Sequence, residues 1–388
     1  MTKNKFKAIA PLVCFLLLFS LVLSPALSPL AVEAHVAISQ TDEDFDYAAV
    51  MSEPRAYTQS ASGVSLSPEQ IKNMRLYAGG IPFGVKFMTE GILIVGFCDI
   101  SENGKKVNPS LSAGLREGDR IISIDGAELL SSLDLTKRIE ESGGKALSIV
   151  YLRNNDRHTT NLTPIYCSEE QCYKSGIYVK DNGAGIGTVT YIDPETLSFG
   201  GLGHGICEGD GANLVPIQRG SIVNVSINGA VKGRVGAPGE VKGNFKSGKI
   251  GSLTKNTNCG VYGVYAALPK GLPTQPLPLC PKTELKEGKA YIYCTLDGKG
   301  PKQYEIEISK INKSSTEGKS FTVKVTDPDL LQITGGIVQG MSGSPIIQNG
   351  KLVGAVTHVL INDPTTGYGI FIENMLNAAQ SQVMPKAA

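Results

Sequence analysis

The stretch Gly340-Met341-Ser342-Gly343-Ser344-Pro345-Ile346-Ile347 is followed by Gln348-Asn349-Gly350 and the apolar run Lys351 to Val356. The Asn-Gly pair predicts a hairpin that leads into a buried strand. Gly340 and Gly343 let the backbone curl around Ser342, so that the amides of Gly340 and Ser342 converge on one point. A serine hydroxyl attacks once a base takes its proton, and the oxyanion that forms needs amide donors about 3 Å away. We therefore predict Ser342 as a nucleophile and these two amides as an oxyanion hole, against the alternative of a serine-rich turn.

A serine nucleophile needs a base, and the chain has 4 histidines. His35 lies in the leader region and His158 in a separate upstream segment, which leaves His204 and His358. The Gly-x-Ser-Gly-x-Pro loop resembles the nucleophile loop of chymotrypsin-like serine peptidases, in which the order along the chain is His, Asp, Ser. This order favours His204, which is flanked by glycines, and leaves His358 to line the substrate pocket.

The third member of such a site is a carboxylate that fixes the tautomer of the imidazole. Asp210, Asp297, Asp327 and Asp329 all lie between His204 and Ser342. Spacing alone does not choose among them.

The C-terminal part of the chain, residues 166–388, is interrupted by Gly or Pro every 8 to 12 residues, with β-branched runs between. This pattern is typical of a large all-β domain. One helix is expected, over Ile372 to Val383. The expected strands are Ile186 to Ile192, Ser221 to Ile227, Gly260 to Ala267, Ala290 to Thr295, Gln303 to Ile308, Phe321 to Thr326 and Leu352 to Val359.

Upstream, residues 77–165 contain Ser112-Ala113-Gly114-Leu115-Arg116-Glu117-Gly118-Asp119-Arg120-Ile121, followed by Asp125-Gly126. This segment resembles a PDZ domain, which binds an extended peptide as an added strand. The resemblance places the carboxylate-binding loop at Gly80 to Gly84 and the edge strand at Val85 to Phe87. Pro82 removes one amide donor from that loop, which favours an internal segment or the chain's own linker as the bound peptide. The expected peptide-binding residues are Gly80, Ile81, Phe83, Gly84 and Val85.

The amino terminus carries Lys3, Lys5 and Lys7 ahead of an uncharged run from Ala8 to Val32. A basic flank before an apolar run is typical of an export signal, so residues 1–36 are interpreted as a signal peptide or a retained membrane anchor. Residues 37–76 are polar and lack apolar periodicity, which indicates a linker. We expect self-cleavage within it, from about Gln40 to Pro68, because a peptidase needs an extended, mobile segment.

Composition disfavours two further classes of function, nucleic-acid binding and metal-dependent proteolysis. With 37 Lys+Arg against 36 Asp+Glu the formal net charge is +1, so no global field of one sign indicates a nucleic-acid partner. The 8 cysteines do not repeat a metal spacing, and no His-Glu-x-x-His motif occurs, which disfavours a metallopeptidase. We expect neither a metal nor another cofactor.

From Thr334 to Gly350, and again from Gly354 to Val359 and from Asn362 to Gly369, the chain resembles the sporulation serine peptidase family typified by stage IV sporulation protein B. Leader, PDZ domain and peptidase domain come in the order of that family. The resemblance implies a Ser-His-Asp triad of Ser342, His204 and Asp327. It also implies self-cleavage, and cleavage of a membrane-embedded regulator that releases an intramembrane metalloprotease and so activates a sigma factor. The implied location is the space between the two membranes of the developing forespore.

The expected fold is therefore mainly β, with a PDZ domain followed by a chymotrypsin-like double β-barrel. The expected function is that of an exported serine endopeptidase. The rival interpretation is a PDZ adaptor with an inactive peptidase domain, which would hold a membrane partner without cutting it.

Overall fold

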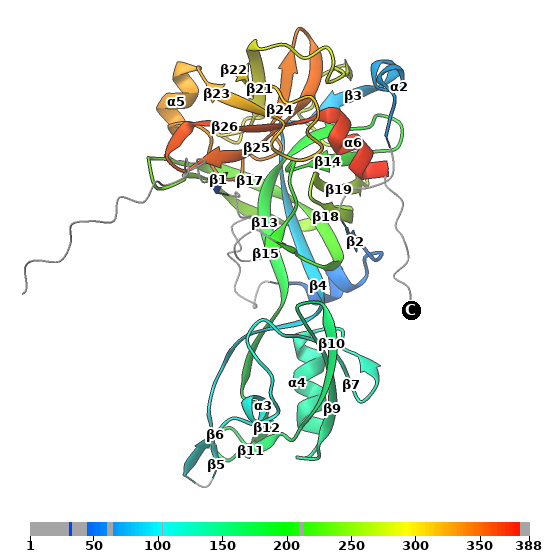
Figure 1. Cartoon of the computed structure of the whole chain (residues 1–388), viewed down its shortest axis with the longest axis vertical. Helices are drawn as coiled ribbons and strands as arrows, with labels where there is room; N and C mark the ends of the chain where they lie inside the picture. The colour runs from blue at the N-terminus through cyan, green and yellow to red at the C-terminus, as the bar shows by residue number, and fades with distance from the viewer. Residues whose placement is uncertain (1–30, 33–44, 60–64, 103, 209–212, 381–388) are drawn as a thin grey trace, which may run out of the picture.

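The computed structural model describes residues 31–32, 45–59, 65–102, 104–208 and 213–380. Two barrels form the upper part of the molecule in Figure 1, and a smaller module, which contains α4, β9 and β10, lies below them. The predicted mainly β architecture with two barrels is confirmed.

The second barrel contains the predicted nucleophile loop and is built from consecutive strands. The strands follow one another in the order β25-β24-β21-β22-β23-β26. Pairing of β25 with β26 joins the two ends of this sheet and closes it into a barrel. Alternate residues such as Ile292, Ile306 and Val323 fill its core. The strands are β21 (Gly288–Cys294), β22 (Lys302–Ser309), β23 (Phe321–Val325), β24 (Pro345–Gln348), β25 (Lys351–Leu360) and β26 (Asp363–Phe371).

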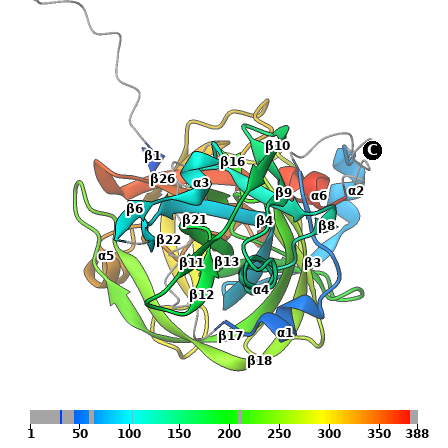
Figure 2. The same cartoon turned by 90° about the horizontal axis from the view of Figure 1, so that it is seen from below.

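The first barrel closes in the same way, in the order β4-β17-β18-β19-β14-β13 with β13 returning to β4. Figure 2 looks along it from below and shows β17 and β18 curving around one side. Phe83, Phe87 and Phe199 pack in its core. The strands are β4 (Pro82–Phe97), β13 (Ile177–Ile192), β14 (Ser198–Gly201), β17 (Ile217–Val231), β18 (Glu240–Thr257) and β19 (Gly260–Tyr265).

The PDZ module, residues 91–176, is inserted into the first barrel and does not precede it. The first half of β4 pairs with β17 inside the barrel, whereas Ile92 and Leu93 pair with β7 inside the module. This finding corrects the predicted boundary at residue 77, because β4, a single strand of 16 residues, belongs to both the first barrel and the PDZ module. The elements of the module are β5 (Ile100–Glu102), β6 (Lys105–Val107), α3 (Pro109–Ser112), β7 (Arg120–Ile124), β8 (Ala127–Glu128), α4 (Ser132–Glu141), β9 (Leu147–Arg153), β10 (Asp156–Leu162), β11 (Ile165–Cys167) and β12 (Cys172–Lys174).

The described part of the predicted linker is folded onto the barrels. Glu53 is fully buried, bonded to Ser221 and paired with Lys249 at 2.8 Å, and Val50 packs against Met88. The expectation of a free linker is therefore wrong for residues 45–58, because Phe45 and Val50 are buried in a cluster with Met88 of β4. The remaining elements are β1 (Ala31–Val32), α1 (Tyr47–Met51), β2 (Tyr57–Thr58), α2 (Pro68–Asn73), β3 (Arg75–Ala78), β15 (Cys207–Glu208), β16 (Asn213–Leu214), β20 (Leu277–Pro278), α5 (Pro328–Thr334) and α6 (Ile372–Gln380).

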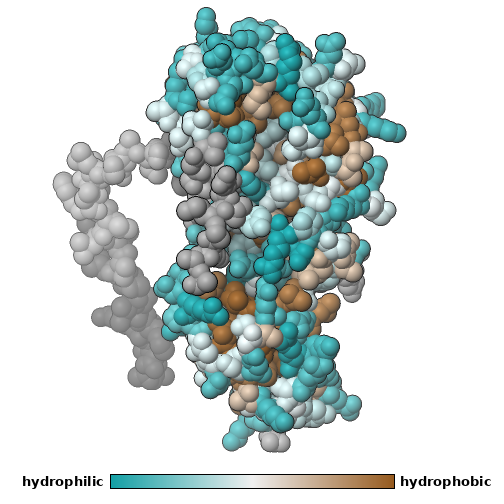
Figure 3. Space-filling model, turned by 90° about the vertical axis from the view of Figure 1, so that its right-hand side faces the viewer, coloured by the Kyte–Doolittle hydropathy of each residue, from teal (hydrophilic) through white to brown (hydrophobic). Residues whose placement is uncertain are grey.

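Figure 3 shows the two lobes from the side, with brown apolar patches among the teal of the lower, PDZ-containing lobe. Among the exposed large hydrophobic residues of the chain are Leu133 of α4, 64% exposed, and Tyr178 of β13, 59% exposed. None of the helices in the described ranges is long and apolar enough to cross a bilayer. The predicted leader, residues 1–30, lies outside the described residues.

Candidate active site

The nucleophile loop runs from Gly340 to Pro345, just before β24. Gly340 and Gly343 adopt φ values of 91° and 93°, in the region that favours glycine. Between them Ser342 is 4% exposed, and its Oγ donates a hydrogen bond of 2.8 Å to the carbonyl of Thr357. The glycines thus hold the hydroxyl at a fixed place beside β25.

The first barrel holds this loop in place through two threonines of β13. The amide of Thr188 donates to the carbonyl of Ser342 at 3.0 Å, and its hydroxyl donates to the carbonyl of Gly340 at 2.8 Å. The hydroxyl of Thr190 donates to the carbonyl of Gly343, also at 2.8 Å. Sequence reasoning missed both threonines, because nothing local in a strand indicates which loop it will contact.

Close packing joins the nucleophile loop to the segment that carries His204. A Cβ on Gly343 would overlap the carbonyl of Thr188 and the amide of Leu202. Leu202 and Gly203 both have positive φ, 63° and 71°, and they turn the chain sharply out of β14 into His204. Glycine at position 343 is therefore required for the two loops to meet.

His204 is buried, 6% exposed, at the end of this turn. Its Nδ1 lies 2.8 Å from the carbonyl oxygen of Gly205. A carbonyl oxygen only accepts hydrogen bonds, so this contact requires the proton on Nδ1. Nε2 is then the basic nitrogen, which is the tautomer that a general base needs.

His358 lies beside His204, with ring centroids 5.1 Å apart. It belongs to β25 and is 5% exposed. Burial, followed by the neighbouring His204 and Lys319, lowers the pKa of His358 to about 2. A ring with so low a pKa stays neutral and is a weak base, which supports His204 as the base.

The amides predicted for the oxyanion hole are those of Gly340 and Ser342. Other amides of the loop are bonded within the protein, since Gly343 donates to Val356 and Ser344 donates to Met341. Among the described residues, neither the amide of Gly340 nor that of Ser342 donates a hydrogen bond to another backbone group. Both amides are thus open to an incoming oxyanion.

The structure does not bring Asp327 to His204, which corrects the expectation taken from the family resemblance. Asp327 is the N-cap of α5, and its carboxylate accepts hydrogen bonds from the amides of Asp329, Leu330 and Glu305. Gly318, which lies against the His358 ring, and Asp327 flank opposite ends of β23. At 3.3 Å per residue that strand separates them by roughly 15 Å.

The alternative Asp329 is exposed on α5. Asp297 is ion-paired with Lys302 at 2.6 Å. Asp210 lies outside the described residues.

The predicted peptide-binding strand is not a free edge. β4 is paired with β13 on one side and with β17 on the other from Gly84 to Met88, so no edge remains there for an added peptide strand. This corrects the assignment, and the physical reason is barrel closure. The residues concerned, Gly80, Ile81, Phe83, Gly84 and Val85, are all buried or half-buried in the first barrel region.

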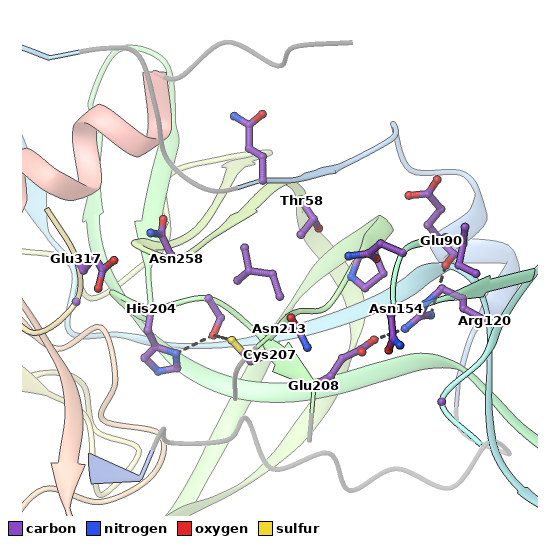
Figure 4. A pocket seen from close by; sticks show the side chains of 18 of the residues that line it. Thr58, Glu90, Arg120, Asn154, His204, Cys207, Glu208, Asn213, Asn258 and Glu317 are labelled. Carbon is purple, nitrogen blue, oxygen red and sulfur yellow. Dashed lines mark hydrogen bonds and ion pairs between the residues drawn. The ribbon is translucent and has the colours of Figure 1, made fainter. Parts of the chain in front are cut away.

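A cavity of about 850 Å³ lies between the barrels and the PDZ module. His204 and Glu317 lie at one end of it in Figure 4, and Arg120 and Asn154 of the PDZ module lie at the other. His358 also contributes to its wall. Sequence reasoning did not identify Glu317 or the contribution of the PDZ module, because both depend on how distant segments pack.

The amino-terminal strand β1 lies against the edge of β25 directly after His358. Ala31 pairs with Leu360 and Val32 pairs with Val359 in antiparallel register. The edge of β25 beside the two histidines can therefore accept an extended strand.

Comparison with known proteins gives one match that covers more than half of the chain. The family model described as SpoIVB peptidase S55 matches residues 171–376, which include the second barrel and most of the first. The matched region also contains Ser342 and both buried histidines.

Two further similarities cover only parts of the chain. It is 31% identical over 99 residues to the zinc metalloprotease RasP of Bacillus licheniformis, a match that covers 25% of this chain and 23% of that protein, so the chain spans about a quarter of the length of this relative. A solved PDZ domain of an SdrC-like protein from Listeria monocytogenes is 19% identical, with a TM-score of 0.19, and the match covers 23% of this chain and 87% of that one.

Proposed function

This chain belongs to the SpoIVB peptidase S55 family and is a serine peptidase, and from this premise we propose that Ser342 is its nucleophile and His204 its general base. The observation that carries the proposal is the close packing of the Ser342 loop on the His204 turn, at Gly343 and Leu202. Two loops from different barrels meet there, as the chymotrypsin-like arrangement requires.

In the proposed reaction the Ser342 hydroxyl gives up its hydrogen bond to the Thr357 carbonyl as substrate arrives. Oγ attacks the scissile carbonyl carbon while Nε2 of His204 takes the proton. The carbonyl oxygen becomes an oxyanion held by the amides of Gly340 and Ser342. His204 then returns the proton to the leaving amine, and water hydrolyses the acyl-enzyme by the same steps in reverse.

The carbonyl oxygen of Gly205 orients the base in this proposal. It accepts the Nδ1 proton of His204 at 2.8 Å and so fixes the tautomer, which is the orienting task of the acid in a triad.

We also propose that the substrate binds as an extended strand along β25, and that the enzyme cuts its own amino-terminal region. The pairing of Ala31 and Val32 with Leu360 and Val359 supports this binding mode, because it puts residues of the chain's own leader beside the part of β25 that follows His358. Residues 45–58, inside the linker region first expected to be cut, are packed on the barrel. We therefore place the proposed cut between Val32 and Phe45.

The family resemblance supports a further proposal for the partner and the location. The proposed substrate in trans is a membrane-embedded regulator of an intramembrane metalloprotease, whose cleavage leads to sigma factor activation. The proposed location is outside the cytoplasmic membrane, between the two membranes of the forespore, with residues 1–36 as signal or anchor.

The test compares the full chain with a full-length Ser342→Ala variant after purification and incubation, with the new amino termini determined by mass spectrometry. We expect a cut between Val32 and Phe45 in the active chain alone. Identical trimming of both proteins would rule out self-cleavage. A fluorophosphonate probe that labels activated serines separates this result from the adaptor alternative, since an inactive adaptor would leave Ser342 unlabelled.

A further inference from the structure

An ion pair between a buried arginine and a half-buried glutamate joins the PDZ module to the segment that follows His204. Arg120, the first residue of β7, has a side chain that is only 9% exposed and is paired with Glu208 of β15. Glu208 follows His204 by four residues. In Figure 4 a dashed line joins these two side chains, which line the same cavity as His204 but lie away from it.

The same guanidinium also contacts the point where the barrel passes into the PDZ module. It donates to the hydroxyl of Thr89 at 3.2 Å and to the carbonyl of Glu90 at 3.4 Å. Thr89 and Glu90 precede the first residue of the module on β4. Arg120 therefore joins the PDZ module, the first barrel and the segment after His204.

A buried guanidinium is costly unless it is paired, because burial removes its hydration. Burial lowers the pKa of Arg120, and the charge of Glu208 acts against that effect. Within the segment from Gly205 to Glu208, Ile206 is buried in the first-barrel core and exchanges hydrogen bonds with Asn256 at 2.8 and 2.9 Å. Glu208, at the end of the segment, pairs with β16 and with Arg120. Arg120 therefore helps to hold the end of the segment that begins at His204.

We propose that Arg120 is a positioning residue for catalysis, which through Glu208 holds the His204 segment in place while the PDZ module is docked on the first barrel. The inference rests on the proposed role of His204. It makes the PDZ module part of the catalytic apparatus, so that a ligand that moves the module away from the barrel would slow the enzyme.

The test measures the labelling of Ser342 in the full chain by a fluorophosphonate, which requires an activated serine and no natural substrate. The variants are Arg120→Met, Glu208→Gln and the double variant. Arg138→Met is the matched control, because Arg138 forms an ion pair with Asp134 on α4 of the same module. Thermal melting of each protein identifies variants that fail to fold. If Arg120→Met fails to fold, Glu208→Gln still tests the ion pair.

We expect the maximal labelling rate to fall roughly 10- to 100-fold in Arg120→Met and in Glu208→Gln, with an unchanged half-saturating probe concentration, because misplacing a catalytic group slows the chemical step. The double variant should be no slower than the slower single variant, since both remove one interaction. Arg138→Met should label at the wild-type rate.

Wild-type labelling of a folded Glu208→Gln, losses that add in the double variant, or an equal loss in Arg138→Met would each overturn the positioning role while leaving the proposed function intact. A wild-type chain that is not labelled at Ser342 would instead overturn the proposed function, and the inference with it.

Discussion

The two barrels differ in whether their strands are consecutive in the sequence. The second barrel uses consecutive segments between residues 288 and 371 and carries the proposed nucleophile, Ser342, on a loop inside that run. The first barrel is interrupted by the PDZ module, so that β4 and β13 pair across about 80 intervening residues, and it carries the proposed base, His204. The conformation of the Ser342 loop therefore depends mainly on local sequence, whereas the position of His204 depends on long-range strand pairing.

The largest expected effect lies in the second barrel. Ser342→Ala should remove activity by up to about 10⁶-fold, as loss of a nucleophile does in such enzymes, while the melting temperature stays close to that of the wild type. Labelling rate and circular dichroism measure the two effects. Ser344→Ala is the control, since its hydroxyl is fully buried; loss of activity there, with activity retained in Ser342→Ala, would show that the nucleophile loop has been misassigned.

The corresponding change in the first barrel tests the base. His204→Ala should approach Ser342→Ala in severity, because members of a catalytic unit are not additive. His358→Ala should be milder, since the low pKa of His358 makes it a weak base. Self-cleavage rates of the two variants give the comparison, and a total loss in His358→Ala with residual activity in His204→Ala would exchange their roles.

The junction between the barrels is tested at Thr188. Thr188→Val keeps the shape but removes the hydroxyl that donates to the Gly340 carbonyl. We expect activity to fall roughly tenfold, because leaving this half-buried carbonyl without its hydrogen bond costs on the order of 1 kcal/mol and loosens the nucleophile loop. The exposed Thr196→Val on the same barrel is the control, and equal activities of the two variants would argue against a role for Thr188.

The pH dependence of stability should report the buried His358. Its folded pKa of about 2 lies below the ordinary value of 6.5, so the unfolded chain binds a proton more readily. Its contribution is fully present above pH 6.5 and is lost as the pH falls, with about 2 kcal/mol lost between pH 7 and pH 5. Urea unfolding should show a smaller pH dependence in His358→Asn than in the wild type; parallel profiles would contradict the assignment.

The smallest expected effect is that of Asp327→Asn. Asparagine caps a helix about as well as aspartate, so stability should change by less than about 1 kcal/mol. Activity should stay within a few-fold of wild type, because Asp327 caps α5 and does not reach His204. Labelling of Ser342 tests this, and a loss as severe as that of His204→Ala would show that the carboxylate acts on the base after all.

Several features were predictable because they depend on local sequence. The strands predicted at residues 290–295, 303–308 and 321–326 match β21, β22 and β23, and α6 begins at the predicted Ile372. The glycines at 340 and 343, expected to let the backbone curl around Ser342, both have positive φ values. Alternating apolar residues and positive-φ glycines are signals that nearest neighbours largely decide.

The sequence by itself determined the all-β class, the PDZ-like pattern and the pairing of one serine loop with a glycine-flanked histidine. Only the tertiary structure decided that β4 lies inside the first barrel, because an apolar strand carries no mark of the sheet it will join. Tertiary structure also put Asp327 on a helix cap, joined Thr188 to the Ser342 loop, and paired Arg120 with Glu208. These contacts bring together residues from 22 to more than 150 positions apart, and closure of the barrels around a packed core is what fixes them.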